Sequence, residues 1–329
     1  MPSHRTRILP ASDPASIDIA ADLLRCGGLV AFPTETVYGL GADASNPDAI
    51  AHLYDAKGRP AFNPLIAHLP HASDAMQIGI FNAAARKLAA AFWPGPLTLV
   101  VPYQGGARVC ELARSGLGTV GIRIPDHPVA HAMLCAFGGP VVGPSANRSG
   151  HVSPTEADHV TEDLAGRIDA VLDSGPTQVG VESTIIDATG PELRLLRPGG
   201  VTRAQVEALI GAPLLDAATD DAARPASPGR LLSHYAPRAR VRLEATHVEP
   251  GEALLTFAGA RPPGAEQAAT ILDLSPEGRL TEAAARLYGA LRALDETGAP
   301  SIAVVPLPRS GMGEAIADRL DRAAAPRSG

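Results

Sequence analysis

The chain has 329 residues, a net charge of −7 and 45% hydrophobic residues, which excludes a disordered protein and one that attracts nucleic acid with its whole surface. This length suits one large domain or two ordinary ones. Cys26, Cys110 and Cys135 lack the spacing of a metal site or a disulfide framework. We therefore expect a cytoplasmic, reducing setting, in which these thiols pack as small buried hydrophobes. We expect neither a signal peptide nor a membrane span.

Up to about residue 211 the sequence predicts alternating helices and strands, from apolar spacing and short apolar runs. Asn46 and Pro47 suit a helix start and Gly58 suits its end, so Lys57 and Arg59 are expected at this end of the helix. The predicted elements are a helix at 17–25, a strand at 29–32, helices at 47–57 and 83–93, strands at 97–101, 120–124, 140–143 and 171–175, a hairpin at 182–200 and a helix at 203–210.

Residues 212–238 are predicted to be a linker, because prolines and acidic residues replace the regular spacing there. Strands then alternate with helices at 276–296 and 314–324, which predicts a small parallel α/β domain. The predicted fold class is α/β throughout, and the chain divides into 1–211, 212–238 and 239–329.

Three basic residues suggest an anion site. Lys57 and Arg59 lie at a helix end, and Arg123 points to the polar face of an alternating strand. Arginine holds a carboxylate or phosphate through two parallel hydrogen bonds, and lysine acts as a point charge. Lys57 and Arg59 could instead only stabilise the helix C-terminus, whereas a buried Arg123 would need an anionic partner.

The loop GPSAN offers Ser145 and Asn147 for hydrogen bonding. It lacks the second glycine of a nucleophile elbow, and Pro144 precedes the serine, which disfavours a serine hydrolase. The two side chains suit ligand binding or, alternatively, a turn in which they bond to their own backbone. Ser183 begins a later strand, where ordinary strand capping is the alternative to ligand binding.

Neither of the common phosphate-binding loops is present. The glycine pairs lack the GxxxxGK[ST] spacing, and no GxGxxG follows a first strand. A nucleotide would therefore bind without these loops. His68 and His234 lie near other candidate residues, but an isolated histidine is more often a structural group.

Six segments in order resemble the YrdC/Sua family of L-threonylcarbamoyladenylate synthases: PTETVYGLG, AKGRP, NPLIAH, VGIRIPDHP, GPSANRSG and ESTIID…LLRPGG. The resemblance covers about residues 16–211, and the remaining chain looks like the two-domain Sua branch. It implies a twisted open α/β sheet curled around a large cavity, followed by a small Rossmann-like C-terminal domain.

The resemblance also implies the reaction. L-Threonine, bicarbonate or CO2 and ATP would give threonylcarbamoyl-AMP and pyrophosphate, for the N6-threonylcarbamoyladenosine modification of tRNA. A carbamate oxygen would attack the α-phosphate, so catalysis depends mainly on positioning and charge neutralisation. Mg2+ is expected to be held by phosphates and water, with no metal ligands from the protein. The tRNA and its threonylcarbamoyl-transfer machinery are implied as further partners.

Site residues follow from positions that match the family's motifs. Those beside the phosphates and the carbamate are Lys57, Arg59, Ser145 and Asn147. Those that match the threonine site are Thr36, His68, Arg123, Gly143 and Ser183, with Arg123 as the carboxylate clamp. Those that match nucleotide contacts are Arg59, Asn63, Thr119, Ser145, Ser153, Arg197, His234 and Tyr235.

His234 and Tyr235 match a linker segment that folds over the cavity as a lid in the family. Many relatives carry a basic residue just before this histidine, whereas this chain has Ser233. The lid's part in phosphate binding is therefore open, with Arg230 as a partial substitute.

Two other functions remain compatible with the sequence. A curved domain with a basic concave face could bind double-stranded RNA or tRNA without chemistry, although the net charge counts against it. A carbamoyl-transfer enzyme could use a related cavity for carbamoyl phosphate. The zinc-finger-like and acylphosphatase-like regions usual in such enzymes do not appear in the sequence.

Overall fold

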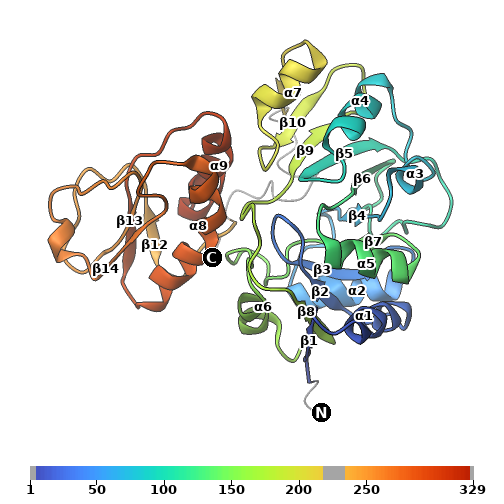
Figure 1. The fold of residues 1–329 in the computed structure, drawn as a ribbon, viewed down its shortest axis with the longest axis horizontal. Helices are drawn as coiled ribbons and strands as arrows, with labels where there is room; N and C mark the ends of the chain where they lie inside the picture. The colour runs from blue at the N-terminus through green and yellow to red at the C-terminus, as the bar shows by residue number, and fades with distance from the viewer. Residues whose placement is uncertain (1–4, 218–233, 327–329) are drawn as a thin grey trace.

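Two α/β units make up the protein, seen in a computed structural model that describes residues 5–217 and 234–326 (Figure 1). The strands are β1 (Arg7–Pro10), β2 (Val30–Phe32), β3 (Gly39–Asp43), β4 (Ile66–His68), β5 (Leu97–Pro102), β6 (Thr119–Arg123), β7 (Val141–Val142), β8 (Ala170–Asp173), β9 (Thr184–Asp187), β10 (Arg194–Arg197), β11 (Leu215–Asp216), β12 (Arg240–Arg242), β13 (Ala253–Thr256), β14 (Thr270–Asp273) and β15 (Ser301–Val304). The helices are α1 (Ala15–Arg25), α2 (Pro47–Lys57), α3 (Ala72–Ala75), α4 (Ala83–Phe92), α5 (Pro128–Phe137), α6 (Ala157–Leu164), α7 (Arg203–Ile210), α8 (Leu280–Glu296) and α9 (Met312–Ala324).

The larger unit is built on a mixed sheet of 11 strands in the order β1-β8-β2-β3-β7-β4-β6-β5-β9-β10-β11. The smaller unit has four strands in the order β12-β15-β13-β14, all of them parallel. The predicted α/β class and the parallel C-terminal sheet are confirmed. None of the described helices combines the length and the apolar composition that a membrane span requires.

The ends of α2 follow the sequence signals. The Asn46 side chain accepts hydrogen bonds from two backbone N–H groups of the first turn, and Pro47 occupies the first helical position. Gly58 ends the helix in the left-handed conformation, with φ 59°. The reversed chain direction brings Arg59 back toward the interior, where its N–H bonds to the Tyr54 carbonyl oxygen.

Three parts of the predicted layout differ from the structure. The helix expected from residue 276 begins at Leu280, after a turn. Within the predicted linker, Leu215–Asp216 form β11, which pairs in parallel with β10 and extends the large sheet. The prediction also omitted β1, β3, β4, β12, α3, α5 and α6. Helix α5 reads PVAHAMLCAF, whose nearly continuous apolar run hides the helical period.

The expectation that all three cysteines pack as buried hydrophobes is wrong. Cys26 and Cys135 are exposed, and Cys110 is half-buried. Cys26 follows the last turn of α1, and Cys135 lies on the outer side of α5, so neither position faces the core.

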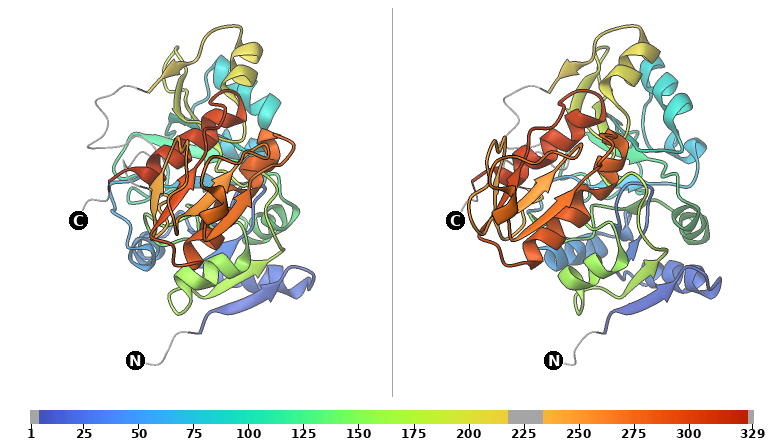
Figure 2. Two further views of the ribbon diagram at one scale, coloured as in Figure 1. Left: turned by 90° about the vertical axis from the view of Figure 1, so that its left-hand side faces the viewer. Right: turned by 60° about the vertical axis from the view of Figure 1, so that its left-hand side comes forward.

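The two units share a continuous apolar interface. Val37, Val152 and Val181 of the larger unit belong to the same buried cluster as the C-terminal core. Gly180, with φ 75°, approaches α8 so closely that a Cβ there would lie 2.4 Å from the Ala284 carbonyl oxygen. Helices α8 and α9 lie between the two sheets, and the smaller unit covers one side of the larger (Figures 1 and 2).

Candidate active site

A small cavity of about 40 Å3 lies where β4, β6 and the loop after β7 meet the segment that enters the smaller unit. Nine predicted site residues line it: Arg59, His68, Arg123, Gly143, Ser145, Ser183, Arg197, His234 and Tyr235. Small-molecule sites usually measure roughly 300–1,000 Å3. A nucleotide could therefore enter this cavity only if part of its wall moved.

Strand register places His68 and Arg123 side by side, because they are paired residues of the parallel strands β4 and β6. Both are buried, as expected if Arg123 occupies the polar face of β6. The anionic partner that a buried arginine needs is Glu35, whose Oε1 lies 2.8 Å from an Arg123 guanidinium nitrogen. Glu35 was not among the predicted site residues.

Arg123 also donates a hydrogen bond to Thr36 Oγ1 at 2.9 Å. Thr34 Oγ1 lies 2.8 Å from Thr36 Oγ1 and donates to the Val37 carbonyl oxygen at 2.6 Å. Since Thr34 uses its hydrogen on Val37, Thr36 must donate to Thr34. The Thr36 oxygen is thus held in place as an acceptor for Arg123.

His68 is neutral in this setting. Burial, with the charge of Arg123 as a smaller cause, lowers the pKa of His68 to about 3. Its Nδ1 lies 3.1 Å from the Ile66 carbonyl oxygen, so the neutral ring donates there. Gly143 permits this arrangement, because a Cβ at that position would lie 2.8 Å from the His68 ring.

Arg59 and Arg197 bring further positive charge to the cavity, and both are buried. Among the described residues, Arg59 donates to the carbonyl oxygens of Asn63 and Pro64, and Arg197 donates to Ser183. Within the described ranges, neither has a carboxylate at ion-pair distance. Burial lowers the pKa of Arg59 to about 10, which still leaves it charged near neutral pH.

Lys57 supports the GPSAN loop from behind. Its buried Nζ donates to the carbonyl oxygens of Ser145, at 2.5 Å, and of Asn147. Burial lowers its pKa well below the usual range, and the charge of Arg59 adds to this. Lys57 therefore holds the loop backbone and does not line the cavity as Ser145 does.

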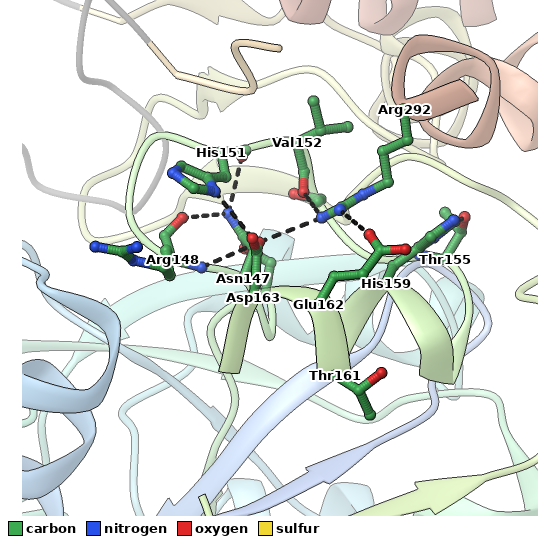
Figure 3. A network of polar contacts seen from close by, with 12 residues as sticks. Asn147, Arg148, His151, Val152, Thr155, His159, Thr161, Glu162, Asp163 and Arg292 are labelled. Carbon is green, nitrogen blue, oxygen red and sulfur yellow. Dashed lines mark hydrogen bonds and ion pairs between the residues drawn. The ribbon is translucent and has the colours of Figure 1, made fainter. Parts of the chain in front are cut away.

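Asn147 is fully buried and uses its amide nitrogen within its own loop. It donates at 2.8 Å to the carbonyl oxygens of Arg148 and His151 (Figure 3). The amide nitrogen of Asn147 thus bonds to the local backbone, which was one of the two predicted roles. Its Oδ1 has no hydrogen-bond partner among the described residues.

Four other predicted residues lie outside the cavity wall. Thr36 is connected to the wall through its hydrogen bond with Arg123. Asn63 is buried beside Arg59, and neither atom of its side-chain amide has a hydrogen-bond partner within the described ranges. Thr119 lines a neighbouring pocket that shares Ile66 with this one, and Ser153 reaches the wall through Glu182.

Glu182 connects the cavity to the smaller unit, a link that the sequence analysis missed. Its carboxylate accepts from Ser153 Oγ at 2.7 Å, from the Tyr288 hydroxyl at 2.9 and 3.1 Å and from Arg319 Nε at 2.7 Å. Arg319 is completely buried. Burial alone would raise the pKa of Glu182, but the charges of Arg319 and Arg197 outweigh it and lower the pKa to about 2.

His234 and Tyr235 form the part of the wall nearest the smaller unit. Tyr235 stacks on Tyr288 with ring centroids 5.6 Å apart, and the Arg319 guanidinium lies 5.2 Å from its ring. Its φ of 60° is a strained conformation for a residue other than glycine. Arg230 was predicted to substitute in part for the basic residue that relatives carry before this histidine. It lies outside the described residues, as do Leu231, Leu232 and Ser233.

A second polar connection joins the GPSAN loop to the smaller unit. His151, which follows the loop, contacts Asp163 at 2.9 Å, and Arg292 of α8 reaches the same carboxylate at 3.3 Å (Figure 3). Arg292 also donates to the Val152 carbonyl oxygen at 2.5 Å. A larger cavity of about 740 Å3 lies between the units here, and Ala236 is part of its lining.

Comparison with known proteins identifies the family. A family model described as "Telomere recombination" matches residues 22–199, and one described as "Threonylcarbamoyl-AMP synthase, C-terminal domain" matches residues 201–325. A threonylcarbamoyl-AMP synthase of Bacillus subtilis is 42% identical, over 97% of this chain and 95% of its own length. The chain belongs to the Sua5 family of two-domain threonylcarbamoyl-AMP synthases.

Other Sua5 relatives agree in sequence and in fold. A threonylcarbamoyl-AMP synthase of Pyrococcus abyssi is 39% identical over 93% of both chains. The crystal structure of P. abyssi Sua5 complexed with L-threonine superposes with a TM-score of 0.86, at 35% identity and 97% coverage of both chains. The predicted family is therefore confirmed for both units.

Replacement of Arg319 by methionine should destabilise the protein strongly, because Glu182 would remain buried without its ion-pair partner. Breaking a buried pair from one side typically costs about 3–5 kcal/mol. Urea unfolding followed by circular dichroism measures the loss. Arg309→Met is the matched control: it removes exposed ion pairs with Asp321 and Glu244, each of which is expected to contribute about 1 kcal/mol or less. Equal losses in the two variants would contradict the role given to Arg319.

Proposed function

We propose that this chain makes threonylcarbamoyl-AMP and pyrophosphate from L-threonine, bicarbonate or CO2 and ATP. The observation that supports this most directly is the unbalanced charge of the cavity. Arg59 and Arg197 are buried at its wall, without a carboxylate at ion-pair distance in the described ranges. A buried cation that no carboxylate contacts directly is unfavourable, so this wall suits an anionic ligand such as a polyphosphate. Membership of the Sua5 family supports the same substrate.

L-Threonine would bind at the Arg123–Glu35 pair. A free amino acid carries one carboxylate and one ammonium group, which Arg123 and Glu35 can satisfy respectively. Glu35 Oε2 and Arg123 Nε have no hydrogen-bond partner within the described ranges, so both retain capacity for a ligand. His68, neutral and adjacent, and Ser183 would contact the remainder of the amino acid. The relative crystallised with L-threonine supports this class of ligand.

ATP would place its phosphates against Arg59 and Arg197, beside Ser145. The GPSAN loop that carries Ser145 is held rigid by Lys57, which favours in-line attack of the threonine carbamate on the α-phosphate. Asn63, Thr119 and Ser153 would contribute to the nucleotide site from around the cavity.

Mg2+ would be held mainly by phosphate oxygens and water. Glu182 is paired with Arg319, and Glu35 is paired with Arg123 and would use its remaining capacity on the threonine ammonium, so neither carboxylate is left for a hard cation. An ion on the phosphates would offset their charge during attack at the α-phosphate.

Residues 234–238 would act as the lid. His234 and Tyr235 line the small cavity, and Ala236, Pro237 and Arg238 line the larger one between the units, so the same segment borders both spaces. Its displacement would join the two and admit ATP. Contacts from Tyr288 and Arg319 of the smaller unit would then return Tyr235 to the closed position.

The alternatives from the sequence are less well supported. An RNA-binding module without chemistry has no use for arginines buried around a small cavity. Carbamoyl-phosphate chemistry is disfavoured by the matched Sua5 C-terminal domain. The product would pass to the enzymes that modify tRNA.

The chain would divide into 1–211, 212–238 and 239–329, except that β11, at the start of the second segment, extends the large sheet.

Pyrophosphate release tests the proposed reaction directly. With ATP and Mg2+ present, release should require both L-threonine and bicarbonate, because the carbamate of threonine is the nucleophile. Each is omitted in turn, with CO2 removed from the buffers, and the adenylate is sought by mass spectrometry. Release with neither compound would indicate a plain nucleotide hydrolase and contradict the proposal.

Arg123→Ala should raise the threonine KM by about 10- to 150-fold, since a hydrogen bond to a charged group contributes roughly 1.5–3 kcal/mol. The threonine KM of Arg123→Lys should lie between those of the unmodified protein and Arg123→Ala, because lysine keeps the charge and loses the two parallel donors. Arg25→Ala, at an exposed position of α1, is the control. Initial rates at varied threonine and saturating ATP measure the effect. An unchanged threonine KM in folded Arg123→Ala would remove Arg123 from the threonine site.

A further inference from the structure

Three metal-ligating side chains meet on the outer surface of the larger unit, away from the cavity wall. His131 and Cys135 are four residues apart on α5 and therefore share one face of the helix. His71 reaches them from the start of α3. One potential ligand atom from each lies within 4.8 Å of the other two, and all three residues are exposed. The sequence shows His131 and Cys135 four residues apart, but His71 lies 60 positions before His131 and joins them only in the fold.

The measured distances are close to those of a tetrahedral metal site. Cys135 Sγ lies 3.9 Å from His71 Nε2 and 3.7 Å from His131 Nε2. Zinc–sulfur and zinc–nitrogen bonds of about 2.3 and 2.05 Å at the tetrahedral angle place sulfur and nitrogen about 3.6 Å apart. Only small rotations of exposed side chains are needed to bring the three atoms around one ion.

We propose that His71, His131 and Cys135 bind a divalent transition metal of the zinc type. A thiolate with two imidazoles is a soft ligand set, which suits Zn2+ or Co2+ and disfavours Mg2+ and Ca2+. A pocket of about 220 Å3 adjoins the cluster, and its lining includes His71, Cys135 and Asp74. A water molecule supplies the fourth ligand, because Asp74 is not among the residues whose ligand atoms lie within 4.8 Å of one another.

The other interactions of these side chains leave them available. His71 and His131 meet edge-on, with ring centroids 5.2 Å apart, and in the described ranges no carboxylate lies at ion-pair distance from either ring. His71 is the N-cap residue of α3, but its side chain makes no capping hydrogen bond. Nothing in these contacts has to be broken for the rings to turn toward a metal.

The metal would connect two segments that lead away from the active site. His71 follows His68 by three residues, and α5 begins five residues after Arg123. A metal bound between His71 and α5 would tie together the segments that follow β4 and β6, the strands that carry His68 and Arg123. The site is thus structural: it lies outside the cavity wall and touches no reacting atom.

Cobalt binding tests this site independently of catalysis. The untagged full-length protein, freed of metal and kept in a non-thiol reductant, is titrated with Co2+. A thiolate-to-cobalt charge-transfer band that saturates at one Co2+ per chain is expected, and Zn2+ should displace it. Cys135→Ser and His71→Ala should lose the band, and Cys26→Ser, which removes the other exposed thiol, should keep it.

Thermal unfolding provides the second measurement. Zn2+ should raise the Tm of the unmodified protein and of Cys26→Ser, because a ligand that binds only the folded state stabilises it. It should leave the Tm of folded Cys135→Ser unchanged. Absence of the cobalt band, or a band of equal intensity in Cys135→Ser, would overturn the proposal.

Discussion

The ion pair between Glu182 and Arg319 is the interaction on which the rest of the site depends. It joins a residue at the cavity wall to a fully buried arginine of α9 in the other unit. Glu182 also accepts from Ser153 and Tyr288, and it immediately precedes Ser183, which accepts from Arg197. The smaller unit is therefore part of the active-site structure, because it satisfies a carboxylate that would otherwise be buried without a partner.

This arrangement leaves the cavity with excess positive charge. Glu182 is engaged by Arg319 and Glu35 by Arg123, so Arg59 and Arg197 face the cavity without a carboxylate at ion-pair distance in the described ranges. Desolvation of these two arginines destabilises the empty protein, and a bound polyphosphate would offset this by pairing with their charges. The small volume and the strained φ of Tyr235 fit a wall that must open for the ligand and close on it.

Much of the site could be predicted because its residues lie in compact sequence motifs. The helix stop at Gly58, the alternation around Arg123 and the GPSAN loop each determine local geometry, and strand register then places Arg123 beside His68. The partners of the arginines could not be found in this way. Arg123 pairs with Glu35, 88 positions earlier in the sequence, and Arg319 lies 137 positions from Glu182. One signal for the second pair was present: Arg319 falls among Ile316, Leu320 and Ala323 on the apolar face of α9.

Arg59 and Arg197 are expected to make this cavity a phosphate site, because both are buried and no carboxylate in the described part of the chain contacts them directly. The most direct test compares the Tm of the full-length protein with tripolyphosphate and with adenosine, each at the same concentration and without Mg2+. The account predicts that tripolyphosphate raises the Tm more than adenosine does, and that Arg59→Met removes most of this gain. Equal stabilisation by adenosine, with no response to tripolyphosphate, would contradict it.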